Sequence, residues 1–237
     1  MIDQRLCIFG LGLMGGSLAQ ALKGKVRHVT GVDRHAATRQ QALKEGAVDA
    51  AAESLASGIA GVDLIILATP VRTILQTLHE LPSLRPDGCM VLDFGSTKQA
   101  INETMSELPH NFAALGGHPM CGKESAGYHA ADPTLFQEQT LILTRNERST
   151  PQIESCVLEI CDLIGTEPLF LEADRHDRLV AAVSHLPYLL SASLMRAAAS
   201  HDDDYLWQTS ASGFRDVSRL AGSDPRMLLD ILLTNRT

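Results

Sequence analysis

The sequence predicts an α/β protein in which a doubly wound parallel sheet is followed by a helical domain. Up to about residue 145, short apolar runs rich in Val, Ile and Leu alternate with polar stretches of helical character. Uninterrupted apolar runs indicate strands buried on both faces, as in parallel sheets covered by helices. After residue 148 the pattern changes to long helical stretches. We therefore predict two domains, 1–148 and 149–237.

Six apolar runs in the first part are predicted strands, because each is compact and bounded by Gly, Pro or Asp. They cover residues 6–10, 28–33, 63–70, 89–95, 111–117 and 139–144. In the second part, residues 153–165 and 174–200 are predicted helices. The second is apolar nearly all round, which favours burial in a larger helical assembly. Pro187 should bend or break it, and the pattern at the chain end predicts a further helix missing from this sequence.

Composition and charge limit the classes of partner. With 237 residues and 45% hydrophobic content, the chain can form one large core or two modest ones. The net charge of −8, without a Lys/Arg cluster, argues against nucleic acid. Five cysteines without CxxC spacing predict neither a disulfide framework nor a metal site. We see no signal peptide and no apolar run of roughly 18 residues, so we expect a cytoplasmic protein that does not bind membranes.

The first predicted strand leads directly into a glycine-rich turn. Gly10, Gly12 and Gly15 have GxGxxG spacing and precede a helix-forming stretch. The first glycine permits a tight turn, the second lets a pyrophosphate approach the backbone, and the third allows close packing of helix on strand. A strand-to-helix turn without a ligand has the same spacing, but the context favours a Rossmann-like dinucleotide site. We assign Leu13 and Met14, between these glycines, to the same site.

The second predicted strand ends at Asp33, about 20 residues after the glycines, where dinucleotide-binding domains carry a carboxylate. A carboxylate there accepts hydrogen bonds from the ribose 2′-OH and repels a 2′-phosphate. The sequence therefore favours NAD over NADP as the cofactor. Two alternatives stay open: Arg34 contacts a phosphate, which would permit NADP, or Asp33 is an ordinary turn residue.

Three further strands end in residues that should meet at the same carboxyl edge, where ligands bind in open α/β sheets. Thr69 and Pro70 are predicted to line the nicotinamide half of the groove, unless they only end their strand. Gly95 is assigned to the cofactor site, and Ser96 either points into the site or caps the next helix. His118 follows the fifth strand. A histidine that faces a nicotinamide can accept the proton of a substrate hydroxyl while hydride leaves the carbon.

Five segments, "GLGLMGGSLA", "DFGSTK", "GGHPMCGKESAG", "SHLPYLLSASL" and "SGFRDVSRLAGSDP", occur in this order. Together they resemble the prephenate and arogenate dehydrogenase family of tyrosine biosynthesis, from about residue 5 to the last residue. The resemblance implies a Rossmann domain, an all-α dimerisation domain and a homodimer. It also implies an NAD-linked oxidative decarboxylation, in which the ring 4-hydroxyl is oxidised while the ring carboxylate leaves as CO2.

The resemblance also implies roles for individual residues. His118 would deprotonate or hydrogen-bond the 4-hydroxyl, and Ser96 would hydrogen-bond both His118 and that hydroxyl. Arg219 would hold a substrate carboxylate, in agreement with the preference of a dicarboxylate for a bidentate cation. Arg215 lies four residues earlier and competes for this role.

Other positions leave the substrate open. Tyr188 stands where members of the family often have a histidine, so arogenate or dual use remains an alternative to prephenate. Ser184 and His185 either line the pocket or pack within the helix. Lys123 and Glu124 follow the "HPM" turn and either contact substrate or lie on a solvated loop.

Two other functions are compatible with parts of the sequence. The β-hydroxyacid dehydrogenases share the N-terminal pattern and resemble one another in using a lysine on the interdomain helix, but this chain has no lysine after Lys123. A non-catalytic NAD-binding regulator is disfavoured by the joint presence of Ser96, His118 and Arg219. The sequence leaves open inhibition by tyrosine and the strength of the dimer.

Overall fold

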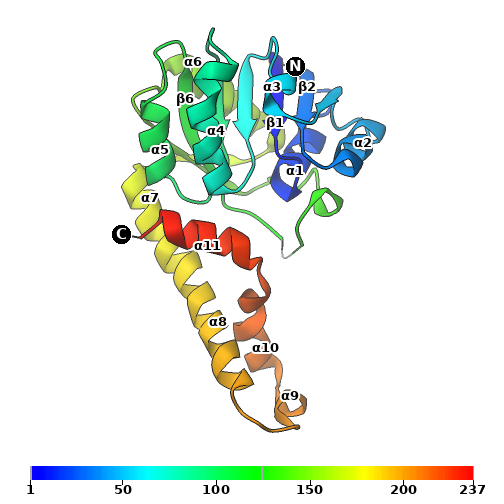
Figure 1. Ribbon diagram of the computed structural model, residues 1–237, viewed down its shortest axis with the longest axis vertical. Helices are drawn as coiled ribbons and strands as arrows, with labels where there is room; N and C mark the ends of the chain where they lie inside the picture. The colour runs from blue at the N-terminus through cyan, green and yellow to red at the C-terminus, as the bar shows by residue number, and fades with distance from the viewer. Residues whose placement is uncertain (1, 124, 237) are drawn as a thin grey trace.

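The computed structural model describes residues 2–123 and 125–236, except for the side chains of residues 2 and 226. An eight-stranded sheet with helices on both faces forms the larger part, and a narrow helical part projects from it (Figure 1). The strand order is β3-β2-β1-β4-β5-β6-β7-β8. The strands are β1 Ile2–Phe9, β2 Val26–Val32, β3 Ala50–Ala52, β4 Leu64–Leu67, β5 Met90–Asp93, β6 Ala113–Pro119, β7 Thr140–Thr144 and β8 Glu167–Phe170.

The first six strands pair in parallel, which confirms the predicted fold class. The last two extend the sheet differently, because β7 is antiparallel to β6 and β8 is parallel to β7. All six predicted strands have a counterpart, whereas β3 and β8 were not predicted. The first of these is three alanines, and the second is a mostly exposed edge strand that contains Pro168. Neither has the apolar run by which we recognised the others.

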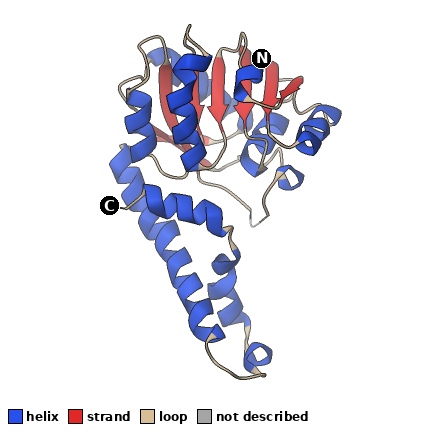
Figure 2. Cartoon of the chain, viewed as in Figure 1, coloured by secondary structure: helices blue, strands red, loops and turns tan. Residues whose placement is uncertain are grey.

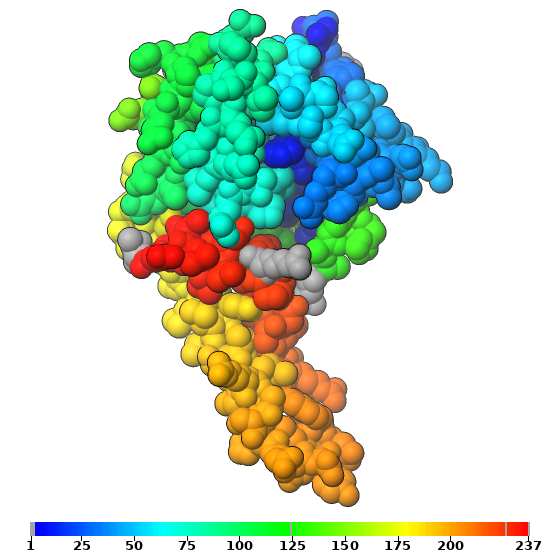
Figure 3. Space-filling model, viewed as in Figure 1, coloured from blue at the N-terminus to red at the C-terminus, as the bar shows by residue number. Residues whose placement is uncertain are grey.

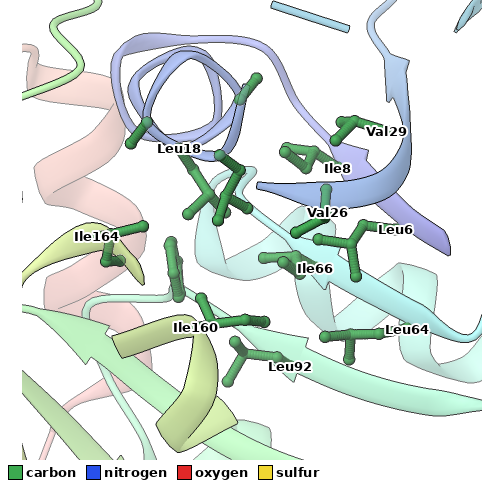
Figure 4. Packing of buried hydrophobic residues seen from close by; sticks show 14 of the residues in the cluster. Leu6, Ile8, Leu18, Val26, Val29, Leu64, Ile66, Leu92, Ile160 and Ile164 are labelled. Carbon is green, nitrogen blue, oxygen red and sulfur yellow. The ribbon is translucent and has the colours of Figure 1, made fainter. Parts of the chain in front are cut away.

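Helices cover both faces of the sheet. They are α1 Leu13–Leu22, α2 Ala36–Lys44, α3 Leu55–Gly58, α4 Val71–Leu84, α5 Gln99–Ser106 and α6 Pro151–Ile164, with a short turn η1 at Tyr128–Ala130. One core cluster joins α1 and α6 to Leu6 and Ile8 of β1 (Figure 4). A second joins α4 and α5 to Cys7 of the same strand. Successive residues of a strand face opposite sides, so both faces are apolar and both are covered.

The structure differs from the predicted boundary after residue 148. Helix α6 lies beyond that point, but its apolar stripe, which includes Ile160 and Ile164, packs into the core beneath the sheet (Figure 4). Strand β8 follows and pairs with β7. The change from sheet to helices therefore comes near residue 171. Helical periodicity alone does not reveal whether the partner of an apolar stripe is a sheet or another helix.

A long helix spanning Ala173–Ala199 dominates the second part (Figure 2). It consists of α7 Ala173–Val180, a π-helical stretch η2 Ala181–His185, and α8 Leu186–Ala199. Pro187 lies in the first turn of α8, directly after η2. The π-helical stretch lets the chain continue without the missing amide hydrogen, so the helix is not broken.

The chain then folds back along this helix. Helices α9 Leu206–Thr209 and α10 Ser212–Ser218 are followed by a 3-10 turn η3 Arg219–Gly222 and by α11 Pro225–Thr234. The turn η3 packs on α8, and α11 returns to the sheet part, where it contacts α4. In Figure 1, α11 crosses below the sheet, beside the edge to which the strand arrows point.

Residues 174–200, for which burial in a larger helical assembly is predicted, are largely exposed within one chain. In α8, only Ser191 is fully buried. Large apolar side chains along the long helix are exposed, including Val183 of η2 at 67% and Leu190 of α8 at 60%. By length and composition alone, the helix Ala173–Ala199 could also cross a membrane, since its most apolar 18-residue segment has a mean hydropathy of 1.2. Only 17% of that segment is buried inside the protein. Figure 3 shows the helical part as a projection with much of its surface free of the sheet domain.

Candidate active site

The glycine-rich turn between β1 and α1 has the geometry that its spacing predicts. Gly10 has a φ of +94°, and a Cβ on it would lie 2.8 Å from the carbonyl oxygen of Ala68. A Cβ on Gly15 would lie 1.9 Å from the oxygen of Gly10. Around Gly12, no described atom beyond its chain neighbours lies within 4 Å of the corresponding position. The turn is thus tight on two sides and open at Gly12, where a ligand can approach the backbone.

A cavity of about 620 Å³ lies beside this turn, at the carboxyl ends of β1, β2 and β4. Six predicted cofactor residues line it: Gly10, Gly12, Asp33, Arg34, Thr69 and Pro70. The Oγ1 atom of Thr69 is buried and has no hydrogen-bond partner among the described residues. A buried hydroxyl normally has a partner, so this atom, in a residue that lines the cavity, stands out as an unused polar group.

Asp33 is held rigidly at the rim of this cavity. Its Oδ2 accepts a hydrogen bond from the backbone amide of Leu11 at 3.0 Å, and its Oδ1 accepts one from the amide of His35 at 2.8 Å. Each carboxylate oxygen can accept a further hydrogen bond. Asp33 therefore orders its turn and still offers acceptors to a ribose.

Three other predicted cofactor residues are in contact with the protein itself and do not line this cavity. Met14 packs against the core, and Leu13 beside it in the first turn of α1 is only partly buried; neither lines the 620 Å³ cavity. The amide of Gly95 donates to Asp93 Oδ2 at 2.7 Å, and a Cβ there would lie 2.5 Å from Ile101 Cδ1. Gly95 and Met14 thus pack against the protein itself, and their assignment to the cofactor site stays a prediction.

A second cavity, of about 270 Å³, lies where the sheet edge meets the helical part. Ser96 follows β5 and His118 is on β6, while the rest of the lining comes from the long helix and the returning chain. Its lining is Ser96, His118, Val183, Ser184, His185, Tyr188, Leu220, Ser223, Met227, Leu228 and Ile231. Five predicted residues thus meet across the two parts of the fold.

Ser96 lines this cavity and is not the N-cap of the next helix. The N-cap of α5 is Lys98, whose own side chain makes no capping bond. Instead, the carboxylate of Asp177 accepts the backbone amides of Lys98 at 2.7 Å and of Gln99 at 3.0 Å. A residue of α7 therefore caps α5, and the hydroxyl of Ser96 is left for the cavity.

The remaining predicted substrate residues lie outside this lining. Arg219 begins η3, next to the lining residue Leu220, and its side chain is exposed, as is that of Arg215 on α10. Lys123 forms an ion pair with Asp132, with Nζ and Oδ2 2.8 Å apart, on an exposed loop. Glu124 lies outside the described residues.

His118 is the first member of a hydrogen-bonded chain that the sequence analysis missed. Its Nδ1 lies 2.8 Å from Nε2 of His176, and Nδ1 of His176 lies 2.7 Å from Oδ1 of Asp177. His176 and Asp177 are 0% and 1% exposed. A signal was present, since His176 and Val180 are four residues apart and share the buried face of α7.

A buried ion pair lies beneath His118. Lys98 Nζ pairs with Asp93 and donates to the carbonyl of Gly117 at 2.7 Å, and both charged side chains are fully buried. The amide of Gly117 in turn donates to Asp93 Oδ1 at 3.2 Å. This pair ties the end of β5 to the residue directly before His118, so the histidine is fixed in position.

Both parts of the chain match family models. Residues 18–168 match the nucleotide-binding domain of prephenate dehydrogenase, and residues 172–237 match its dimerization domain. The chain belongs to the prephenate dehydrogenase family. The division between the two matches falls where the structure changes from sheet to helices.

Individual relatives agree with this assignment. The chain is 35% identical over 240 residues to a prephenate dehydrogenase of Bacillus subtilis, covering 98% of this chain and 64% of that protein. A prephenate dehydrogenase from A. aeolicus, solved with hydroxyphenyl propionate and NAD+, is 27% identical with a TM-score of 0.90, covering 100% of this chain and 84% of that one. A Synechocystis arogenate dehydrogenase is 32% identical with a TM-score of 0.81, covering 98% and 84%. The chain thus spans about two thirds of the length of its Bacillus relative.

The electrostatics of the 270 Å³ cavity favour a neutral His118. Burial lowers the pKa of His118 well below its ordinary value, and His176, Lys98 and His185 lower it further. Burial also lowers the pKa of His185. For Asp177, burial works toward a higher pKa, but the hydrogen bonds from His176 and from two backbone amides outweigh it, so that pKa is lowered. The site therefore combines an unprotonated imidazole with an ionised carboxylate.

Proposed function

We propose that this chain is an NAD-dependent dehydrogenase that converts prephenate to 4-hydroxyphenylpyruvate with loss of CO2. The observation that carries this proposal is the 270 Å³ cavity, in which neutral His118 and Ser96 face residues of the helical part. It lies at the same sheet edge as the glycine-rich turn. The relatives named prephenate dehydrogenase support this substrate.

The residues beside the glycine turn fit NAD. Gly12 leaves the backbone open, Asp33 offers carboxylate acceptors at the rim, and buried Thr69 Oγ1 lacks a partner among the described residues. When bound there, NAD supplies an acceptor for a hydride. The carboxylate of Asp33 disfavours a 2′-phosphate, so we propose NAD rather than NADP as the main cofactor.

In the proposed reaction, His118 moves a proton in both directions. Its unprotonated imidazole takes the proton of the ring 4-hydroxyl as the hydrogen on the same carbon leaves as hydride, and that carbon becomes a carbonyl. The ring carboxylate then leaves as CO2, and the electron pair of the broken C–C bond moves through the ring to the oxygen. The oxygen takes the proton back from His118, which gives a phenol and restores the neutral imidazole. Ser96 is proposed to hydrogen-bond the same hydroxyl and His118.

The substrate carboxylates need a cation, and we assign that role to Arg219. Its neighbour Leu220 lines the cavity, which places Arg219 beside the cavity along the chain. His185, Ser184 and Tyr188 are proposed to contact the rest of the substrate. Lys123 is already paired with Asp132 and is the weakest of the proposed contacts.

Arogenate is the second candidate substrate. It differs from prephenate by an amino group on the side chain. Tyr188 lines the cavity where family members often have a histidine, and the chain is 32% identical to an arogenate dehydrogenase. An enzyme that accepts both substrates is the third alternative.

We also propose that the chain is a cytoplasmic homodimer formed through the helical part. Residues 172–237 match a dimerization domain, and large apolar side chains of the long helix are exposed in the single chain. An exposed apolar stripe of this kind is typical of a protein–protein interface.

The decisive experiment measures formation of NADH or NADPH by the purified chain. Prephenate and arogenate are each offered with NAD and with NADP, in four parallel assays. We expect turnover with NAD and prephenate, and the ratio of kcat/KM values ranks the substrates and cofactors. Binding of NAD without turnover of either substrate would instead support a non-catalytic NAD-binding protein.

A further inference from the structure

We infer that His176, held by Asp177, is a positioning residue that fixes which ring nitrogen of His118 carries the hydrogen. This leaves Nε2 of His118 as the proton acceptor that faces the substrate. The inference rests on the proposed role of His118 as a base. It also makes a statement about the free protein that is tested without any substrate.

Asp177 determines which ring nitrogen of His176 carries a hydrogen. Its carboxylate accepts three hydrogen bonds, from the backbone amides of Lys98 and Gln99 and from the ring of His176. An ionised carboxylate has no hydrogen to donate. The Nδ1 atom of His176, at 2.7 Å from this carboxylate, must therefore be the donor.

The position of the hydrogen on His176 then determines the position of the hydrogen on His118. We take the fully buried His176 as a neutral imidazole, which carries one N–H. With that hydrogen on Nδ1, its Nε2 is unprotonated. That atom lies 2.8 Å from Nδ1 of His118, and the two rings meet edge-on at 69°. The hydrogen between them must then belong to His118. The Nδ1 atom of His118 is consequently the donor and its Nε2 is the acceptor.

The proposed catalysis places a positive charge on the ring of His118. When Nε2 of His118 takes a proton, the imidazolium lies beside the Lys98–Asp93 pair and near His185, and both Lys98 and His185 disfavour a positive charge there. Asp177 is the nearest carboxylate connected to this ring by hydrogen bonds, and His176 transmits its influence. The hydrogen-bonded residues His176 and Asp177 thus stabilise the protonated form of His118 without contacting substrate.

The hydrogen bonds from His118 to His176 and on to Asp177 also join the two parts of the fold. His118 is on β6 of the sheet, whereas His176 and Asp177 are on α7 at the start of the helical part. The Nδ2 of Asn235, just after α11, donates to the carbonyl of Asp177 at 2.8 Å. Correct seating of the helical part on the sheet is therefore needed for the correct state of His118.

Two substitutions test this inference in the full chain. His176→Leu replaces the ring by a side chain of similar size that cannot accept a hydrogen bond from His118. His176→Gln keeps an oxygen that can accept this hydrogen bond. His110→Leu, at an exposed position before β6, is the matched control. The readouts are ring 15N NMR of His118 in the free protein, thermal unfolding, and kcat and KM as functions of pH. All kcat values are normalised to folded protein.

We expect the wild-type spectrum to show His118 with hydrogen on Nδ1. His176→Leu should lose this preference and lower kcat by roughly 10- to 100-fold, a part of the ~10²–10⁴-fold that a general base contributes. The KM for NAD should barely change, and the pH dependence of kcat should shift. His176→Gln should keep the tautomer and recover part of kcat.

Other outcomes would overturn the inference. Hydrogen on Nε2 of wild-type His118, or an unchanged tautomer and kcat in His176→Leu, would mean that His176 only packs. If His176→Leu does not fold, His176→Gln decides, because unaltered kcat and pH dependence in that variant also contradict a positioning role. If the chain oxidises neither substrate, the proposed function fails, but the tautomer measurement still tests the hydrogen-bonded chain.

Discussion

At the scale of single residues, the proposed chemistry depends on keeping one imidazole neutral and correctly aimed. Burial lowers the pKa of His118, and the neighbouring Lys98, His176 and His185 lower it further. The base form is therefore the resting form at neutral pH. His118→Asn should lower kcat by a factor of about 100 or more, because asparagine cannot accept the proton. Steady-state kinetics with NAD titration should show little change in NAD affinity, and near wild-type kcat would mean that His118 is structural.

Cofactor choice is assigned to Asp33. Replacing Asp33 with Ser removes both the acceptor for a 2′-OH and the charge that repels a 2′-phosphate. We expect weaker use of NAD and relatively better use of NADP. Asp33 also accepts the amides of Leu11 and His35, so Asp33→Asn, which keeps one acceptor oxygen, is the matched control for damage to the turn. Equal relative use of the two cofactors in wild type and Asp33→Ser would contradict the assignment.

Substrate binding is assigned to Arg219 rather than Arg215. Arg219→Ala should raise the KM for the substrate by an amount equivalent to roughly 2 to 4 kcal/mol, the cost of losing a charge-assisted pair that bound substrate would bury. Arg219→Lys should recover only part, since lysine lacks the planar fork. The KM for NAD should hardly change in either variant. A selective substrate defect in Arg215→Ala, with Arg219→Ala unaffected, would move the carboxylate site to the preceding helix.

At the scale of elements, the long helix is the part that a single chain leaves incomplete. Val183, Leu186 and Leu190 are 67%, 52% and 60% exposed and follow one another at spacings of three and four residues. That spacing places them on one face of the helix. In the proposed homodimer, a second copy of the chain covers this face.

Leu190→Glu should therefore shift the chain from dimer toward monomer in sedimentation measurements, because a charge in an apolar interface is left unpaired. Leu43→Glu serves as the control, since Leu43 is a similarly exposed leucine, at 44%, on α2 of the sheet domain. An unchanged sedimentation profile in Leu190→Glu would mean that this face is not the dimer interface.

The elements also show what the sequence could and could not predict. Strong apolar runs located six of the strands, and the GxGxxG spacing located the turn before α1. Helix α6 was assigned to the helical domain although it packs on the sheet. Its apolar stripe does not indicate whether a sheet or another helix covers it. His176 and Asp177 were missed because polar residues are common at the charged start of a helix. Only their contacts with β6 and with the start of α5 distinguish them, and those contacts cannot be read from the sequence. The Asp177 caps on α5 span 79 and 78 residues in sequence, beyond any local pattern.

At the scale of the whole molecule, the site exists only where two independently recognisable parts meet. The Oγ1 atoms of Thr97 and Thr234 lie 2.9 Å apart across this junction, and Arg72 lies 3.7 Å from Asp230. The junction also holds His118 and His185, whose pKa values are both lowered by burial. Stability of the junction should consequently depend on pH.

The sign of this dependence follows from proton binding. Below the ordinary histidine pKa of 6.5 the unfolded chain binds a proton at residue 118, whereas the folded chain does not until its lowered pKa is reached. The free energy of unfolding should therefore fall as pH drops below 6.5, by at most about 1.4 kcal/mol per pH unit for this group. His118→Asn has no such proton to bind, so its free energy of unfolding should fall less steeply over the same range. Urea unfolding of both proteins between neutral and mildly acidic pH measures the difference, and parallel curves would show that His118 is not held neutral by the fold.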